Sequence, residues 1–192
     1  MTLEKINILT ERLLIRILKR EDLEDFHFYR SNPEVTKYQG FDVMTQEECL
    51  AFITNQEGLL FGKVGEWIQY GLEDITTGKI VGDCAIKLDQ YDVRIAEVGI
   101  TISHTEQRKG YAKETFHAIL SFLFDQKELH RVVEIVDAEN AASIQLLKST
   151  GFRQEGHFIE NIFFKGKWGS EFQYALLKKE WDATKQQLLL TI

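Results

Sequence analysis

Along the first half of the chain, some runs of hydrophobic and polar residues have the period of a β-strand and others have the period of an α-helix. Four runs have the length and β-rich composition of strands, namely residues 11–17, 66–72, 80–88 and 93–102. Residues 21–30 and 45–56 have helical spacing instead, and Thr45 with Glu48 three residues later resembles a capping box. The turn at 74–79 joins two strands into a hairpin. The pattern therefore predicts a strand, two helices and a three-stranded meander.

The second half of the chain begins with an amphipathic helix from about residue 109. Its apolar stripe comprises Ala112, Thr115, Phe116, Ile119, Phe122 and Leu123. The next elements are a strand at 132–136, a helix at 141–149 and a hairpin of residues 152–164 and 168–177, and residues 181–190 are either a terminal helix or a frayed tail. Since a helix separates strands 93–102 and 132–136, we expect them to be parallel neighbours in a right-handed crossover. The element order indicates an α+β (mixed α/β) layer fold.

Composition narrows the class of protein. The 192 residues contain 23 cations and 30 acids, a net charge of −7, which argues against a general nucleic-acid binder. No linker interrupts the chain, so we expect a single domain over residues 1–192. Neither a signal core nor a run of about 18 apolar residues is present, and Cys49 and Cys84 are lone thiols. The sequence predicts a soluble cytoplasmic protein that binds no membrane. The five histidines have no metal-ligand spacing, so we expect no metal.

One polar stretch between a strand and a helix carries candidate chemistry. It reads Gln107-Arg108-Lys109-Gly110-Tyr111-Ala112. The first N–H groups of a helix are unpaired and carry partial positive charge, so this site suits a diphosphate. Gly110 would let backbone approach a ligand closely. On this stretch alone, a phosphate cradle and an ordinary strand–helix turn both remain open.

A second motif lies downstream, where Asn140, Ser143, Gly151 and Phe152 fit the pattern Asn-x-x-Ser followed by Gly-Phe. With the Gln107–Ala112 loop, it resembles the GNAT superfamily of acyl-CoA-dependent N-acetyltransferases. The start, 10–16, is similar to the subgroup that acts on α-amines of ribosomal proteins, and the resemblance covers about residues 9–181. It implies a mixed, mostly antiparallel sheet of about seven strands, with helices on both faces and a splayed central parallel pair.

The resemblance also implies where acetyl-CoA would bind. The pantetheine arm would pair with the backbone of Ile100, Thr101 and Ile102 between the splayed strands. The pyrophosphate would contact the loop residues Gln107, Arg108, Lys109, Gly110, Tyr111 and Ala112, with charge-assisted contacts from Arg108 and Lys109. Asn140 is a hydrogen-bond partner for the cofactor, a helix N-cap, or both.

Three residues are candidates for catalysis. The resemblance turns Ser143 towards the thioester, where it would bond the leaving sulfur; many relatives use a tyrosine four residues later, but this chain has Leu147. Glu97 is the first candidate base, with a cross-strand salt bridge as the alternative. Glu160, on the closing hairpin, is the second, with a solvent-facing role as the alternative.

The sequence thus predicts an acetyltransferase that transfers acetyl from acetyl-CoA directly to a primary amine, either a protein N-terminal α-amine or a small molecule. Two alternatives stay open: transfer of a different acyl group, and a non-catalytic acyl-CoA-binding regulatory module. A homodimer through the closing hairpin is compatible with the pattern.

Overall fold

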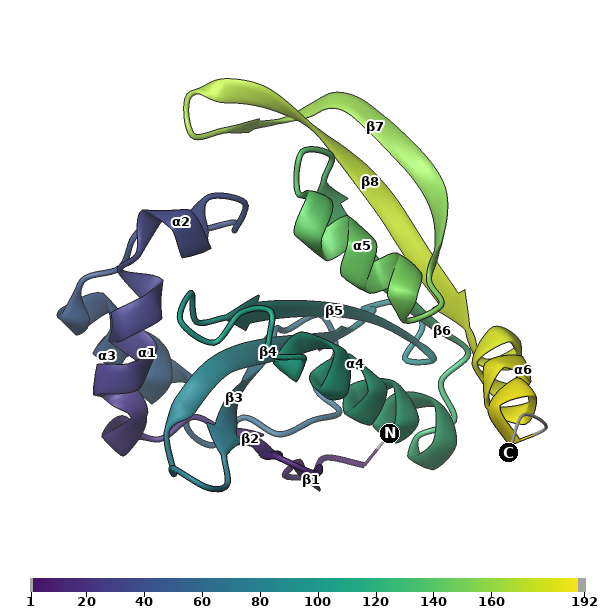
Figure 1. Ribbon diagram of the computed structural model, residues 1–192, viewed down its shortest axis with the longest axis horizontal. Coiled ribbons are helices and arrows are strands. Elements are labelled where there is room, and N and C mark those ends of the chain that lie inside the picture. Colours follow the sequence, from purple (N-terminus) through teal and green to yellow (C-terminus); the bar gives the residue numbers. More distant parts are fainter. Residues whose placement is uncertain (1, 190–192) are drawn as a thin grey trace.

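The computed structural model describes residues 2–189 (Figure 1). Met1 and residues 190–192 lie outside the described residues, and with them the two ends of the predicted domain and Leu190 of the predicted terminal segment. The strands are β1 (Asn7–Leu9), β2 (Leu13–Ile17), β3 (Ile68–Asp74), β4 (Ile80–Leu88), β5 (Ile95–Ile102), β6 (Arg131–Asp137), β7 (Arg153–Phe164) and β8 (Lys167–Leu177). The helices are η1 (Arg20–Asp22), α1 (Leu23–Arg30), α2 (Pro33–Thr36), α3 (Gln46–Gln56), α4 (Tyr111–Ser121), the π-helical turn η2 (Phe122–Gln126), α5 (Ala141–Ser149) and α6 (Lys178–Leu189).

The strands form one eight-stranded sheet in the order β1-β2-β3-β4-β5-β6-β8-β7. Every neighbouring pair is antiparallel except β5 and β6, which are parallel. The predicted mixed fold with a central parallel pair is therefore confirmed. The sheet has one strand more than the expected seven, because β1 was missed. A three-residue edge strand with largely exposed side chains has no alternation that a sequence pattern can reveal.

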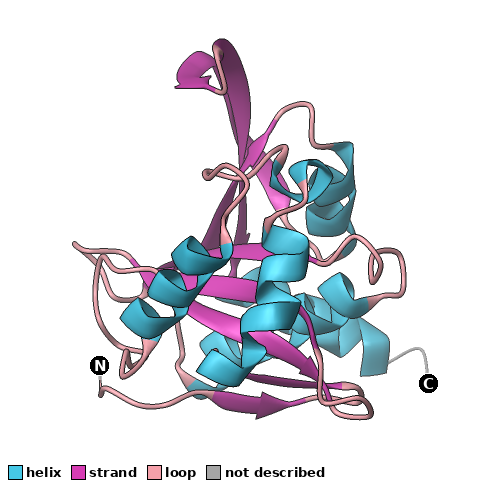
Figure 2. Cartoon of the chain, turned by 90° about the vertical axis from the view of Figure 1, so that its left-hand side faces the viewer, coloured by secondary structure: helices cyan, strands magenta, loops and turns pink. Residues whose placement is uncertain are grey.

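Helices cover both faces of the sheet, as predicted. On β4, Asp83 accepts a hydrogen bond from Tyr29 of α1, whereas the next residue, Cys84, belongs to the main core cluster that includes Phe116 of α4. Since successive side chains on a strand point to opposite faces, α1 and α4 lie on opposite sides of the sheet. Helices α1 and α3 share a smaller apolar cluster with Ile80. Seen from the side of α1 and α3, helices cross in front of the strands (Figure 2).

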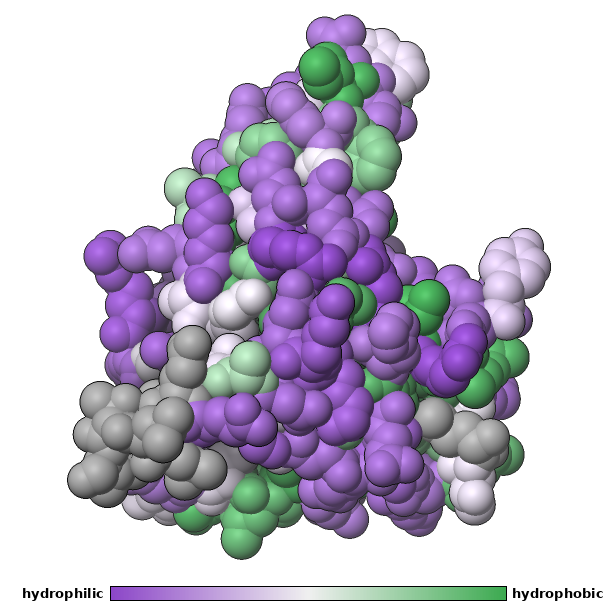
Figure 3. Space-filling view, turned by 90° about the vertical axis from the view of Figure 1, so that its right-hand side faces the viewer, coloured by the Kyte–Doolittle hydropathy of each residue, from purple (hydrophilic) through white to green (hydrophobic). Residues whose placement is uncertain are grey.

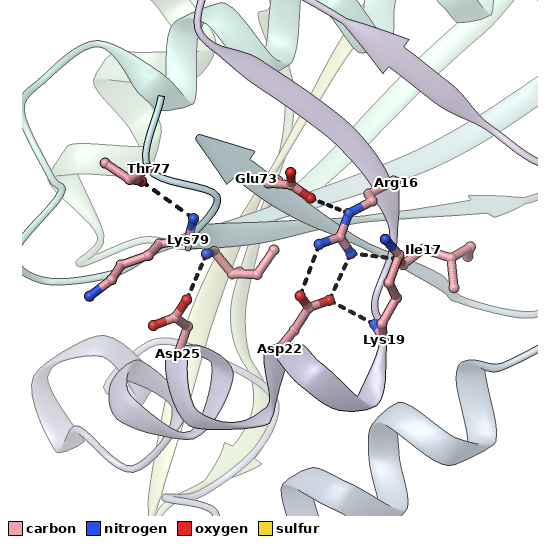
Figure 4. A network of polar contacts seen from close by, with 9 residues as sticks. Arg16, Ile17, Lys19, Asp22, Asp25, Glu73, Thr77 and Lys79 are labelled. Carbon is pink, nitrogen blue, oxygen red and sulfur yellow. Dashed lines mark hydrogen bonds and ion pairs between the residues drawn. The ribbon is translucent and has the colours of Figure 1, made fainter. Parts of the chain in front are cut away.

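A buried arginine attaches the first helical segment to the sheet (Figure 4). Arg16 of β2 is 6% exposed and donates to both carboxylate oxygens of Asp22, at 2.7 and 2.9 Å, and also to Glu73 of β3. The hydrogen bond with Asp22 raises the pKa of Arg16 despite its burial, so the guanidinium stays charged. Asp25 of α1 accepts from the backbone N–H of Ile80 at 3.0 Å. These contacts fix α1 against β2, β3 and β4, beside the site described below.

The closing hairpin extends beyond the body of the molecule (Figures 1 and 2). Its register shifts twice on β7, at Gln154/Gly156 and at Phe158/Ile162. Towards its outer end a few green and pale residues lie among purple ones (Figure 3), and Ile159, Phe163 and Trp168 of this hairpin are 73%, 62% and 60% exposed. The homodimer suggested for this hairpin stays a prediction.

The chain continues from β8 into α6, so the segment predicted as either a helix or a frayed tail is helical as far as Leu189. Within residues 2–189, no helix combines the length and the apolar composition needed to span a bilayer.

Candidate functional site

Strands β5 and β6 separate after only three residue pairs. Their parallel register joins Ile95 to Arg131, Ala96 to Val132 and Glu97 to Val133. Beyond that point β5 stays paired with β4 on one edge and β6 stays paired with β8, so each keeps its outer partner while the two diverge. A cavity of about 530 Å³ opens between them. Among the predicted site residues, its lining includes Glu97, Ile100, Thr101, Asn140 and Ser143.

The loop between β5 and α4 has the geometry of an anion cradle. Arg108 and Gly110 have positive φ angles of 63° and 88°, and Gly110 is the N-cap of α4. The side-chain amide of Gln107 donates to the carbonyl of Ile102 at 3.2 Å, which ties the loop to the end of β5. Within residues 2–189, the backbone N–H groups of Gly110, Tyr111 and Ala112 donate no hydrogen bond. Exposed, unpaired donors at a helix start suit a phosphate group.

The start of α4 is held by the turn between β1 and β2, through contacts of Thr10 and Arg12 with Glu114 that we call the clasp. The Glu114 carboxylate accepts from the Thr10 hydroxyl at 2.6 Å, from the Arg12 backbone N–H at 2.9 Å and from Arg12 Nε at 2.7 Å. Although burial acts against it, this set of hydrogen bonds lowers the pKa of Glu114, so the carboxylate stays ionised. Arg12 Nη1 also donates to the carbonyl of Lys109 at 2.9 Å. The start motif 10–16 thus acts on the candidate cradle without facing the cavity.

Tyr111 of the loop motif has a structural position rather than an exposed one. It is 9% exposed, and its hydroxyl donates to Asp74 at 2.7 Å. This hydrogen bond, with burial, raises the pKa of Tyr111 to about 12. The ring also lies 4.5 Å from the Arg12 guanidinium. Tyr111 therefore anchors the first turn of α4 to β3.

The second motif sits at the start of α5. Asn140 is the N-cap, and its side-chain oxygen accepts from the backbone N–H of Ser143 at 3.2 Å. The capping alternative therefore holds, and Asn140 also lines the cavity. Ser143 is half-buried and lines the same cavity. Leu147, one turn further on, is buried in the main core.

The two predicted carboxylates differ in position. Glu97 lines the cavity, and its carboxylate lies 2.5 Å from Lys87 Nζ, directly across the β4–β5 ladder. The cross-strand salt bridge is thus present, and a base role for Glu97 stays a prediction. Glu160 is exposed at the β7 register shift, with φ 48°, and its N–H donates to Ser170 at 2.9 Å. It is not among the residues that line the cavity, so the structure does not bring it together with Glu97.

A third carboxylate in the cavity, Glu134, is not among the residues that the sequence motifs predict. It lies on β6, lines the cavity and is 8% exposed, and its Oε2 has no hydrogen-bond partner within residues 2–189. Burial raises the pKa of Glu134 well above its ordinary value, and the charge of Glu97 raises it further. A single acid in the apolar run Val132-Val133-Glu134-Ile135-Val136 is the signal that marks it in the sequence.

The cavity reaches a buried ion pair beneath α1. Arg30 Nη2 lies 2.6 Å from Asp83 Oδ1, with side chains 3% and 0% exposed. Asp83 also accepts from Tyr29 and Gln69, and burial with the Asp83 charge raises the pKa of Tyr29. The aromatic ring of Phe41 lies 4.1 Å from the guanidinium. This network fixes the cavity wall opposite β6.

With this geometry in place, the chain can be compared with known proteins. Residues 12–153, more than half of its length, match the family model described as an acetyltransferase (GNAT) domain. The chain belongs to the GNAT acetyltransferase family. The predicted superfamily resemblance and the prediction of an acyltransferase are confirmed.

Individual relatives agree. YnaD of Bacillus subtilis, an uncharacterised N-acetyltransferase, is 32% identical over 177 residues, 92% of this chain and all of its own. A spermidine N(1)-acetyltransferase of Vibrio cholerae is 25% identical over 166 residues, 83% of this chain and 90% of its own. The crystal structure of a GNAT-family acetyltransferase from Bacillus anthracis superposes with a TM-score of 0.81 at 29% identity, covering 91% of this chain and 99% of the other.

Proposed function

We propose that this protein is an acetyl-CoA-dependent N-acetyltransferase that acts on a cationic primary amine. The observation that carries the proposal is the split between β5 and β6, which opens an acid-lined cavity beside an anion cradle. The acceptor is a protein N-terminal α-amine or a small-molecule amine.

The residues at the split fit acetyl-CoA. The β5 backbone at Ile100, Thr101 and Ile102 pairs with β4 along one edge, while β6 has diverged from the other edge, so this second edge would accept an extended amide-bearing arm. The backbone from Arg108 to Ala112, with unpaired N–H groups at Gly110, Tyr111 and Ala112 within residues 2–189, would bind the pyrophosphate. Acetyl-CoA, when bound, supplies the activated acyl group.

The charge of the cavity favours a cationic acceptor. Its charged lining residues are one cation, Arg30, and the acids Asp83, Glu97, Glu134, Asp137 and Glu171. Arg30 pairs with Asp83, Lys87 pairs with Glu97, and burial favours the neutral form of Glu134, so the remaining charge is that of Asp137 and Glu171 and is negative. A cleft lined by one sign of charge concentrates ligands of the other sign. An ammonium group, as in a polyamine or an N-terminus, is therefore attracted into the cavity.

The proposed chemistry assigns a role to each candidate. Glu97 would accept the proton that the amine loses, directly or through water, since it lies on the acceptor side beside Lys87 and Trp67. Ser143 would donate a hydrogen bond to the leaving sulfur. Glu160 remains a second candidate base, weakened by its place outside the cavity lining. Holding the amine against the acyl carbon contributes most of the remaining acceleration.

The test is release of CoA thiol from acetyl-CoA in the presence of an amine panel of polyamines, small monoamines and N-terminal peptides. We expect turnover with at least one cationic amine, and calorimetric binding of acetyl-CoA that a Gly110→Glu change abolishes. No binding of acetyl-CoA by the wild-type protein contradicts the proposal. Binding without turnover on any amine favours a non-catalytic acyl-CoA-binding module. Faster thiol release with another acyl-CoA donor favours the alternative acyl group.

A further inference from the structure

We propose that Glu134 is the acid that protonates the departing sulfur, a role that rests on the proposed function above. Glu134 is the first residue of β6 beyond the last pair with β5, so it sits at the vertex of the split. Its side chain is more than nine-tenths buried, lines the cavity and leaves Oε2 without a partner within residues 2–189. A buried polar atom without a partner is costly, and at a cavity it indicates a ligand.

The two cavity carboxylates at the vertex face opposite sides of the sheet. Glu97 shares its face with its ladder partners Lys87 and Val133, and Lys87 lies against Trp67. Glu134 is the next residue after Val133, so it points to the other face. That face carries Val132, Val136 and Leu147, which belong to one core cluster. Glu134 is therefore on the α5 side, where the acyl-CoA motif begins.

Glu97 and Glu134 also differ in the charged groups that lie beside them. Glu97 forms an ion pair with Lys87, whose Nζ lies 2.5 Å from the carboxylate. Among residues 2–189, no cation forms an ion pair with Glu134: its ladder partner on β8 is Tyr174, whose hydroxyl donates to Gln154, and the charge that acts on it is the Glu97 carboxylate. Burial and this like charge favour the protonated form of Glu134. Two neighbouring carboxyls held in opposite states are the arrangement that supplies one acid and one base.

The absence of a tyrosine strengthens the assignment. Leu147 occupies the position at which the GNAT resemblance implies an acidic tyrosine in many members, and Ser143 alone is a poor proton source because a serine hydroxyl is so weakly acidic. A thiol ionises with a pKa of about 8.5, so a carboxyl with a raised pKa can protonate the thiolate readily. Glu134 thus supplies the function that the missing tyrosine leaves open.

The ammonium group of the acceptor first releases one proton to water. The neutral amine nitrogen then forms the new C–N bond to the acyl carbon, and the C–S bond breaks with its electron pair on sulfur. Glu134 gives its carboxyl proton to that sulfur, which leaves as the thiol. The nitrogen loses one proton to Glu97, and exchange with water returns Glu134 to its acid form and Glu97 to its base form.

The decisive test compares two acyl donors in wild type, Glu134→Gln and Glu97→Gln. Acetyl-CoA has a poor leaving group, whereas the acetyl thioester of 4-nitrothiophenol has a good one that needs no acid. We expect E134Q to lose about 100-fold in kcat with acetyl-CoA and to approach wild type with the activated thioester. E97Q, the matched control, should lose the same factor with both donors, because both require the amine to lose a proton.

Two readouts besides activity accompany the kinetics. The wild-type protein at neutral pH should show the infrared band of a protonated carboxyl, which E134Q lacks and E97Q keeps. Calorimetric affinity for acetyl-CoA should stay within about 3-fold in E134Q, because the amide keeps the shape of the neutral carboxyl and lacks only its ionisable proton. Absence of the band, or an equal loss of E134Q activity with both donors, overturns the acid role.

The outcomes also separate the two proposals. If the wild type turns over amines and E134Q matches it with acetyl-CoA, only the role of Glu134 fails. A wild type that binds acetyl-CoA but acetylates no amine overturns the proposed function, and the acid role with it.

Discussion

Arg12 binds Glu114 across 102 residues of sequence, with Nε 2.7 Å from Oε2 and the Arg12 backbone N–H 2.9 Å from Oε1. The same guanidinium donates to the Lys109 carbonyl in the loop before α4. One pair therefore links the start of the sheet to the first turn of α4 and to the candidate cradle. The side chain of Glu114 is only 16% exposed, so its hydrogen bonds are shielded from water.

The first prediction removes the charge of this clasp. Glu114→Gln should lower the free energy of unfolding by about 1.5–3 kcal/mol, the usual contribution of hydrogen bonds to a charged group. It should also raise the Kd for acetyl-CoA, since the loop loses its support. Urea unfolding and calorimetry measure the two effects. Glu11→Gln, at an exposed neighbouring acid, is the control and should change neither quantity. An unchanged Kd in E114Q would show that the clasp stabilises the fold but does not shape the cradle.

The second prediction concerns the left-handed glycine of the cradle. Gly110 has φ 88°, and an added Cβ would lie 3.3 Å from Arg12 Nη2. Gly110→Ala should therefore cost about 1–2 kcal/mol of stability and weaken acetyl-CoA binding. Gly78, in the β3–β4 turn with φ 70° and open space around it, is the matched control. Gly78→Ala should show a similar loss of stability with unchanged binding. Equal binding by the two variants would contradict a cradle at Gly110.

Local signals explain which elements the sequence predicted well. The capping box is present, with Glu48 accepting from the Thr45 N–H at 2.8 Å and Thr45 accepting from the Glu48 N–H at 3.2 Å, and α3 begins where it indicates. The predicted β4 and α5 have the bounds seen in the structure. The bounds of each of these elements are set by residues close to its own ends, so the local sequence pattern is enough to predict them.

Long-range packing explains what the sequence did not predict. The isolation of Glu134 depends on where β5 and β6 part, which no local pattern records. The clasp of Glu114 depends on a turn about one hundred residues earlier. Glu160 lies at an irregularity of β7, so counting along an ideal strand could not give its direction. The motifs thus predict the positions of the candidate cradle and of α5. The environments of the charged residues around the cradle and α5 depend instead on contacts between elements that are distant in the sequence.

The third prediction breaks the buried pair under α1. Asp83→Asn leaves Arg30 as an uncompensated buried cation and should cost about 3–5 kcal/mol of unfolding free energy. The control is Asp42→Asn, at an exposed acid 3.7 Å from Lys165, which should stay within about 0.5 kcal/mol of wild type. Chemical denaturation measures both. A small loss in D83N would mean that water or a rearranged Gln69 satisfies Arg30.

The last prediction turns the state of Glu134 into a pH dependence of stability. Its folded pKa lies above the ordinary value of 4.5, so between these two values the folded protein holds a proton that the unfolded chain has released. The stability from this group is therefore complete below about 4.5 and is lost as pH rises through the folded pKa. The slope of stability against pH reaches about 1.4 kcal/mol per pH unit for one proton.

Glu134→Gln removes this pH-dependent contribution. The unfolding free energy of E134Q minus that of wild type should therefore grow with pH above 4.5 and then level off at the folded pKa. Titrating groups that do not interact with Glu134 are common to both proteins and cancel in the difference. Parallel stability curves from denaturant titrations between pH 4 and 9 would mean that Glu134 ionises normally in the folded protein, and a group that is already ionised has no proton to give to the sulfur.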